Sequence, residues 1–152
     1  MTELKESKSA GGAAVGSRPW PLADELTAPF WDAAAAQRLV VQRCTECALL
    51  RFPPSARCSH CHSDGVEWAE LSGRATLYSF IIDHRNMIPG FEGAYTVALA
   101  TPDEVTDDSI RFVTNVPGCP PEDLRIGMPL TVTFEVVHDG VTLPQFVPEA
   151  GS

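Results

Sequence analysis

The sequence predicts a mainly β protein, in which a short N-terminal helix precedes a metal-binding ribbon and a small closed barrel. Two Cys-x-x-Cys pairs lie ten residues apart, and five segments rich in Val, Ile, Thr, Tyr and Phe follow residue 73. Thirteen prolines and eleven glycines in 152 residues favour many short elements joined by turns. A chain of this length accommodates one ordinary domain or two small modules packed together.

The helix is predicted from the segment TAPFWDAAAAQRL. Thr27 is the predicted N-cap, Pro29 suits the first turn, and four consecutive alanines favour a helix. Phe30 and Trp31 are too large an apolar load for a short helix to leave in water. Two interpretations stay open: these side chains pack on their own domain, or they anchor the helix to another chain.

Each Cys-x-x-Cys pair can turn both sulfurs toward one point, so two pairs supply four tetrahedral thiolates. We therefore predict a zinc site formed by Cys44, Cys47, Cys58 and Cys61. An iron centre of the rubredoxin kind uses the same ligands, and a disulfide framework would need an oxidising compartment that nothing in the sequence indicates. His60 and His62 flank one ligand and are interpreted as exposed residues of the loop.

Such a zinc ion is structural, because four thiolates leave no open coordination position for a water molecule. Zinc–peptide binding energies are on the order of 10–16 kcal/mol, more than a segment of this size gains from apolar burial. We expect strong chelation to melt the ribbon.

The remainder of the chain reads as strands separated by turns. Three short strands accompany the cysteines, and five more follow in about 75 residues with a single helical turn in PPEDLRIG. This pattern suits a small barrel better than a sandwich. We expect a disordered tail over residues 1–18, a helix region over 19–38, the zinc ribbon over 39–72 and the barrel domain over 73–152.

Charge narrows the classes of function. The net charge is −9, and residues 73–152 carry four arginines against eleven acidic residues. Nucleic-acid binding depends on Lys and Arg that neutralise phosphates, so no nucleic-acid partner is expected. No apolar stretch approaches the ~20 residues that span a bilayer, and the N-terminus has no secretory signal. We therefore expect a cytoplasmic protein without a membrane partner.

No catalytic residue is predicted. The sequence has no G-x-S-x-G, H-E-x-x-H or glycine-rich nucleotide motif. Cys119 is the one cysteine outside the ribbon, and its position before two prolines favours a packing role. Asp83 and His84 are adjacent, and neighbours in a strand point to opposite faces.

From about Phe30 to Pro148, the chain resembles the zinc-ribbon plus OB-fold proteins associated with acyl-CoA metabolism. Their helix and rubredoxin-like ribbon are similar to FWDAAAAQRLVVQRCTECALLRFPPSARCSHCHSDGVEWAELSGRATLYSF, and their OB-fold half to AYTVALA, RFVTNVPGCPPEDLRIGMPLTVTF and LPQFVP. The specific signature is the helix, RFPP, the cysteine spacing and DLRIGMPL in this order. One departure is that Ala48 and His62 stand where the family often has Gly.

The resemblance implies an OB-fold over residues 73–152 and a role as the small, non-catalytic subunit of a thiolase-like enzyme. The large subunit, itself a dimer, would carry catalysis in a heterotetramer acting on acyl-CoA, by thiolysis or retro-aldol cleavage. We expect Phe30 and Trp31 at the partner interface. Arg85, Met87 and Phe91, in an apolar loop, are candidates for contacts to a CoA shared with the partner.

Two alternative hypotheses for the function can also be compared with the sequence. Zinc ribbons and OB-folds also serve as nucleic-acid-binding modules, which use a basic face with aromatic side chains, and the acidic charge argues against this. A free-standing enzyme would have to use Cys119, and its substitution within the assembled complex would test that.

Overall fold

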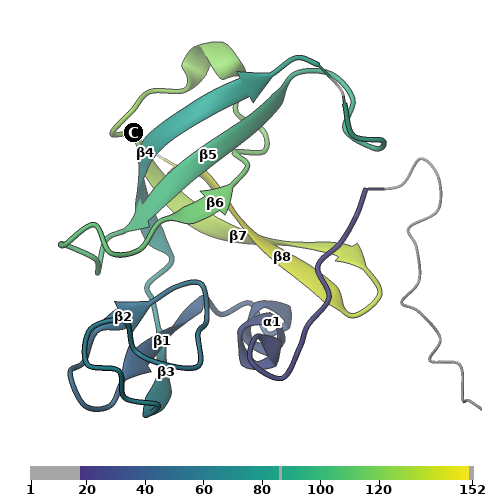
Figure 1. Cartoon of the computed structure of the whole chain (residues 1–152). Helices are drawn as coiled ribbons and strands as arrows, with labels where there is room; N and C mark the ends of the chain where they lie inside the picture. The colour runs from purple at the N-terminus through teal and green to yellow at the C-terminus, as the bar shows by residue number, and fades with distance from the viewer. Residues whose placement is uncertain (1–17, 86, 151–152) are drawn as a thin grey trace, which may run out of the picture.

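The computed structural model describes residues 18–85 and 87–150 and has a mainly β architecture, as predicted (Figure 1). Its one α-helix in this range is α1 (Ala28–Ala35). The ribbon contains β1 (Val40–Cys44), β2 (Leu50–Arg51) and β3 (Val66–Glu70). The C-terminal half contains β4 (Arg74–Asp83), β5 (Tyr95–Pro102), β6 (Phe112–Thr114), the 3-10 helix η1 (Pro121–Asp123), β7 (Pro129–His138) and β8 (Val141–Pro148). The predicted tail, residues 1–18, lies outside the described residues except for Arg18.

The start of α1 differs in detail from the prediction. Thr27 occupies the N-cap position, but its side chain does not cap the helix. Instead, Thr27 Oγ1 donates to Asp24 Oδ1 at 2.7 Å, and the Thr27 N–H donates to the same oxygen at 2.8 Å. A turn beginning at Asp24 therefore leads into α1, and Asp24 satisfies a backbone donor at the helix entrance. These hydrogen bonds to Thr27 lower the pKa of the Asp24 carboxyl.

The ribbon is a three-stranded antiparallel sheet in the order β2-β1-β3. Gln42 in β1 lies opposite Arg51 in β2 and Trp68 in β3, so these three residues share one face of the sheet. The strand β2 is only two residues long, because Pro53 and Pro54 follow it and cannot donate to a ladder.

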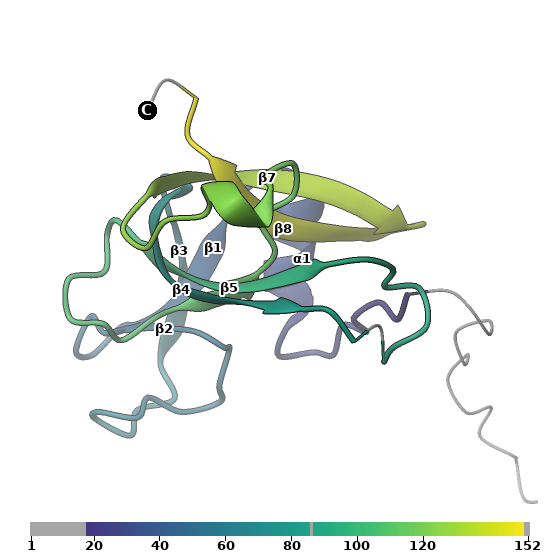
Figure 2. The same cartoon turned by 90° about the horizontal axis from the view of Figure 1, so that it is seen from above.

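The C-terminal half is a five-stranded antiparallel sheet in the order β6-β5-β4-β7-β8. The sheet curls on itself (Figure 2), and its edge strands β6 and β8 come into contact, which gives the OB-fold. Within the described residues no register pairs β6 with β8. The barrel is thus partly open and not closed by a hydrogen-bonded ladder, and α1 packs against β8 beside the opening.

One hydrophobic core joins the helix, the ribbon and the OB-fold. Its axis is a row of aromatic rings: Phe30 lies 5.2 Å from Phe52, Phe52 lies 4.5 Å from Phe112, and Phe112 lies 5.8 Å from Phe146, measured between ring centroids. Such pairs add to the stabilisation that burial gives. The ribbon and the OB-fold therefore share a core, although each has its own sheet.

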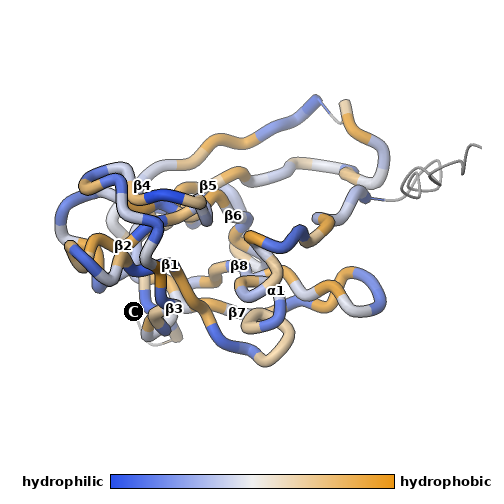
Figure 3. Tube along the Cα trace, turned by 60° about the horizontal axis from the view of Figure 1, so that its bottom comes forward, coloured by the Kyte–Doolittle hydropathy of each residue, from blue (hydrophilic) through white to orange (hydrophobic). Residues whose placement is uncertain are grey.

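Apolar segments of the described chain are short and are separated by polar ones (Figure 3). Among the described residues, no helix has both the length and the apolar character needed to cross a membrane.

Candidate metal centre and exposed surfaces

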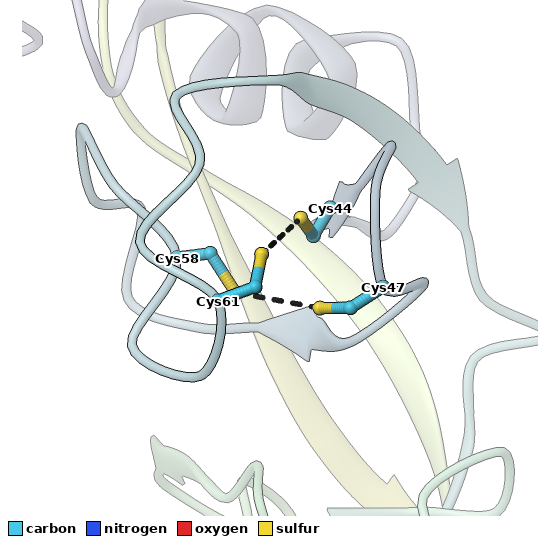
Figure 4. A group of neighbouring side chains, drawn as sticks. All are labelled: Cys44, Cys47, Cys58 and Cys61. Carbon is cyan, nitrogen blue, oxygen red and sulfur yellow. Dashed lines mark hydrogen bonds between the residues drawn. The ribbon is translucent and has the colours of Figure 1, made fainter.

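The four ribbon cysteines converge on one point (Figure 4). Their sulfur atoms all lie within 4.8 Å of one another. The Cys44 and Cys61 sulfurs are 3.5 Å apart, and the Cys47 and Cys58 sulfurs are 3.6 Å apart. A tetrahedral zinc–thiolate site with bonds of ~2.3 Å has sulfur–sulfur edges of about 3.8 Å. The quartet therefore fits a zinc ion without rearrangement of the backbone.

Two loops of the same shape position the cysteines. In the first, the Ala48 N–H donates to the Cys44 carbonyl at 2.9 Å, and the Cys44 N–H donates to the Leu49 carbonyl at 2.9 Å. The second loop repeats both bonds fourteen residues later, from His62 to Cys58 at 3.0 Å and from Cys58 to Ser63 at 2.8 Å. Each Cys-x-x-Cys pair therefore forms an equivalent turn.

Ala48 and His62, which stand where the family often has Gly, occupy backbone conformations that favour glycine. Ala48 and His62 both have a φ of 61°, in the left-handed region that glycine adopts without strain. Both residues tolerate the conformation their loops require, so the turns form at a modest cost in backbone energy.

Backbone donors prepare the site for a cation. The N–H of Cys47 lowers the pKa of Cys44, and the N–H of Cys61 lowers the pKa of Cys58 to about 6. The N–H of Leu49 also favours the Cys47 thiolate, but burial and the neighbouring sulfurs outweigh it and raise the pKa of Cys47 to about 12. Four thiolates at this spacing repel one another without a cation. A divalent ion is therefore required for all four to ionise, and the predicted structural zinc fits this donor set.

The two aromatic residues of α1 differ in how far they are buried. Phe30 is 4% exposed and belongs to the shared core, where its ring meets Trp31 edge-on at 4.9 Å. Trp31 is only partly buried and lines a groove of about 280 Å³ between α1, the Phe52–Pro54 segment and the edge strands β6 and β8. Of the pair, only Trp31 is accessible in this chain, and its role at an interface stays a prediction.

The three loop residues proposed for CoA lie in different environments. Met87, 71% exposed, and Phe91 line a small apolar pocket of about 130 Å³. The Phe91 ring packs edge-on against Tyr95 at 4.6 Å, and the Arg18 guanidinium lies 4.9 Å above it. Arg85 is outside this pocket, with its Nε donating to Asp83 Oδ1 at 3.4 Å. The structure thus brings Met87 and Phe91 into one pocket, and Arg85 contacts Asp83, another residue that lines it.

Cys119 is not an activated thiol. Burial and the nearby carboxylates of Asp123 and Glu122 raise its pKa, so the thiol stays protonated at neutral pH. Its side chain is partly buried against the hydrophobic core, and its sulfur lies 3.6 Å from the Pro120 carbonyl.

Sequence reasoning missed an exposed apolar face on the outside of strands β4, β5 and β6. The register places Ile81 opposite Val97, and Leu99 opposite Val113, on the surface away from the core. Ile81 is 63% and Val113 71% exposed. The signal was the segment TLYSFII, where apolar residues occupy both faces of a strand instead of alternating. We call Tyr78, Ile81, Val97, Leu99 and Val113 the outer face.

The fold and the four-thiolate centre define a zinc ribbon joined to an OB-fold. Family models agree along the chain: the ChsH2 rubredoxin-like zinc ribbon domain matches residues 31–67, and the ChsH2 C-terminal OB-fold domain matches residues 68–135. The chain belongs to the ChsH2 family, also called DUF35.

Three relatives illustrate the family. A chain of the solved "Ltp2-ChsH2(DUF35) aldolase" is 38% identical with a TM-score of 0.76, and the match covers 84% of this chain and 98% of that one. A "Probable enoyl-CoA hydratase alpha subunit" of Thermomonospora curvata is 39% identical over 131 residues, which is 86% of this chain. The "3-oxo-4,17-pregnadiene-20-carboxyl-CoA hydratase alpha subunit" of Mycobacterium tuberculosis is 31% identical over 114 residues, 75% of this chain. The matches span 40% and 35% of the two hydratase subunits.

Proposed function

We propose that this chain is a non-catalytic accessory subunit of a thiolase-like enzyme that acts on acyl-CoA, either a thiolase or a retro-aldolase, as in lipid or steroid side-chain degradation. The observation that carries the proposal is the similarity to the "Ltp2-ChsH2(DUF35) aldolase", an enzyme whose name gives two components. The match covers 98% of one of its chains. The steroid-CoA hydratase subunit adds support for the substrate class.

The chemistry of the described residues favours a non-catalytic role for this chain. Four thiolates fill the coordination sphere of zinc, so the ion activates neither water nor substrate. The raised pKa of Cys119 removes the best candidate nucleophile. Catalysis is therefore assigned to the large subunit, with this chain needed for assembly.

The outer face is the best candidate for the contact with that subunit. An exposed apolar patch that spans three strands is typical of a protein interface. The Arg111 guanidinium lies 3.8 Å above the Tyr78 ring at its border, and arginine and tyrosine are enriched at interfaces. Trp31 offers a second aromatic contact at the far side of β6, beside the groove of about 280 Å³.

A shared acyl-CoA site agrees with the size and charge of this chain. The pocket formed with Met87 and Phe91 measures about 130 Å³, below the ~300 Å³ at which ligand sites begin. The OB-fold half carries a net charge of −7, which repels the phosphates of CoA. The partner would thus supply most cationic contacts, and the loop would cover only part of the ligand.

Co-expression with a thiolase-like large subunit tests the proposal. We expect the two chains to co-purify as a heterotetramer and the large subunit to lose acyl-CoA turnover without its partner. A large subunit that is fully active alone and never associates with this chain would overturn the proposal.

Substitutions locate the interface. The double variant Ile81→Glu and Val113→Glu places two carboxylates on the outer face and should abolish co-purification while leaving zinc content unchanged. The matched control is Ile126→Glu and Val136→Glu, two equally exposed apolar residues away from the outer face. Equal effects of both pairs would argue against the outer face.

A further inference from the structure

The first described residues of the chain bridge two hairpins of the OB-fold. Figure 1 shows this segment, in dark purple, running from α1 toward the β4–β5 loop. Arg18 Nε donates to the Gly90 carbonyl of that loop at 2.7 Å, and the Arg18 guanidinium lies 4.9 Å from the centroid of the Phe91 ring. Two residues later, the centroid of the Trp20 ring lies 4.0 Å from that of the His138 imidazole, at the end of β7. One short segment therefore contacts the β4–β5 and the β7–β8 hairpins at once.

The two bridged hairpins are otherwise separate at their tips. Among the described residues, β4 pairs with β7 only from Arg74 to Thr76, and from there the two hairpins diverge (Figure 1). No hydrogen bond within the described part of the chain joins the β4–β5 loop to the turn of the β7–β8 hairpin. The contacts of Arg18 and Trp20 thus span a gap that the sheet itself does not close.

On the β4–β5 side, Arg18 binds a preformed turn. The Phe91 N–H donates to the Ile88 carbonyl at 3.2 Å, with Pro89 and Gly90 at the two central positions. Gly90 has a φ of 86°, and a proline followed by a glycine of positive φ is typical of a type II turn. The Gly90 carbonyl that accepts from Arg18 is therefore held in place by the turn.

The local sequence prepares the segment for these contacts. Arg18 precedes Pro19 and Trp20 precedes Pro21, and a residue before proline is restricted to extended backbone conformations. In an extended backbone, residues two apart point to the same side. Arg18 and Trp20 accordingly both line one cleft between the hairpins.

This cleft is large enough to hold a ligand. Its volume is about 550 Å³, above the ~300 Å³ at which ligand sites begin. Arg18, Pro19 and Trp20 form part of its wall, together with Phe91 and His138 from the two hairpins. The cleft keeps this volume with the segment in place, so the segment is a wall of the cleft and not a plug.

We propose that Arg18 and Trp20 form a clasp that holds the Gly90–Phe91 turn against the β7–β8 hairpin and completes the cleft. Arg18 is a positioning residue, because it acts through Phe91. The contacts lie outside the shared core and are individually modest, so the clasp can open while the core stays folded. Phe91 is also a proposed contact of CoA. The clasp therefore fixes where this loop meets acyl-CoA, and that link rests on the proposed function.

Reciprocal substitutions in the zinc-loaded chain test the clasp. We expect Arg18→Gln to speed the amide exchange of Phe91 several-fold and to move the imidazole resonances of His138, at one fixed pH, by removing the ring current of Trp20. Trp20→Leu should speed the exchange of Phe91 too, although Trp20 stacks on the other hairpin. If each substitution changes only its own hairpin, the two contacts are independent and there is no clasp.

Two controls separate the clasp from general effects. Arg57→Gln, an exposed arginine of the ribbon, should change neither readout. All variants should keep the melting temperature of the wild type, and a lower one in Arg18→Gln would attribute the faster exchange to loss of global stability.

Arg18→Lys distinguishes the guanidinium contacts from charge. Lysine keeps the positive charge but lacks the planar group that donates through Nε and stacks on a ring. Arg18→Lys should therefore behave as Arg18→Gln does. Wild-type behaviour of Arg18→Lys would show that attraction to the acidic OB-fold half suffices, and would overturn the assigned contacts.

The effect on acyl-CoA is tested in the complex with the large subunit, and this arm rests on the proposed function. Arg18→Gln should raise the KM for acyl-CoA several-fold at unchanged kcat, because the clasp positions a binding loop and no reacting group. A loss of kcat at unchanged KM, or no change in either, would overturn this role. Failure of the wild-type complex to form would count against the proposed function, and the exchange measurements on the isolated chain would still decide the clasp.

Discussion

Gly73 and Val132 are in contact where the ribbon meets the OB-fold. The Val132 N–H donates to the Gly73 carbonyl at 2.8 Å, and a Cβ built on Gly73 lies 2.5 Å from Val132 Cγ1. Gly73 also has a φ of +83°, a backbone conformation that is unfavourable for residues with a Cβ atom. The junction therefore requires glycine for its backbone conformation and for the close approach of β7.

Gly73→Ala is predicted to destabilise the chain by more than about 2 kcal/mol, since backbone strain and overpacking add. Gly93→Ala is the matched control, because its φ is +79° but nothing lies within 4 Å of the added Cβ. Urea unfolding of both variants separates the two effects. Equal losses of stability would show that the contact with Val132 contributes nothing.

Ala48→Gly is predicted to stabilise the zinc-loaded chain by up to about 1 kcal/mol. Glycine removes the left-handed strain of ~1–2 kcal/mol, and the greater freedom of the unfolded chain offsets part of this gain. Ala56→Gly, at an exposed loop position outside the residues of positive φ, should be neutral or destabilising. Chemical denaturation in excess zinc measures both, and a loss of stability in Ala48→Gly would refute the prediction.

Removal of zinc is expected to destabilise both modules. Phe52 follows β2 on the ribbon and packs against Phe112 of the OB-fold, so melting of the ribbon exposes part of the shared core. Chelation, or Cys44→Ser, should increase amide exchange in β5 and β6 as well as in β1. Cys119→Ser, which leaves the quartet intact, serves as control. An OB-fold with unchanged exchange after verified loss of metal would contradict this.

Glu104 is predicted to make stability depend on pH. Burial alone would raise its pKa, but hydrogen bonds from Ser72, including the backbone N–H at 2.6 Å, outweigh burial and lower it. Because the folded pKa lies below the unfolded one, the stabilisation is present above the unfolded pKa and is lost as pH falls through the folded pKa. Glu104→Gln should lose under about 1 kcal/mol at pH 7 and progressively less in acid.

The measurement is urea unfolding of the wild type, Glu104→Gln and the exposed Glu92→Gln, from pH 7 down through the folded pKa of Glu104. A constant difference between wild type and Glu104→Gln at every pH would show that the carboxylate charge is not responsible.

The local pattern of the chain predicted most of the fold. Each predicted strand segment contains an observed strand, and the helical turn predicted in PPEDLRIG is η1. The cysteine spacing was sufficient to predict the metal site, because the donor residues lie in two equivalent local turns. Short-range chemistry determines all of these features.

Features that depend on tertiary contacts were not predictable. Phe30 is buried because Phe52, twenty-two residues later, packs on it, and no local pattern indicates this partner. Arg51 is buried in β2 although its guanidinium nitrogens have no hydrogen-bond partner among the described residues, and no local pattern indicates this burial. The left-handed φ of Ala48 and His62 was indicated only by the family's preference for glycine.

The aromatic row from Phe30 to Phe146 also limits which ribbons and OB-folds can be combined in one chain. The ring of Phe52 belongs to the ribbon, while its neighbour Phe112 belongs to the OB-fold, so the two rings must match in size and position. A chimera whose ribbon and OB-fold come from relatives with side chains of different size at these two positions would leave a void or a clash at this contact. The two modules are therefore expected to be inherited, and to be exchanged successfully in engineering, as a single unit.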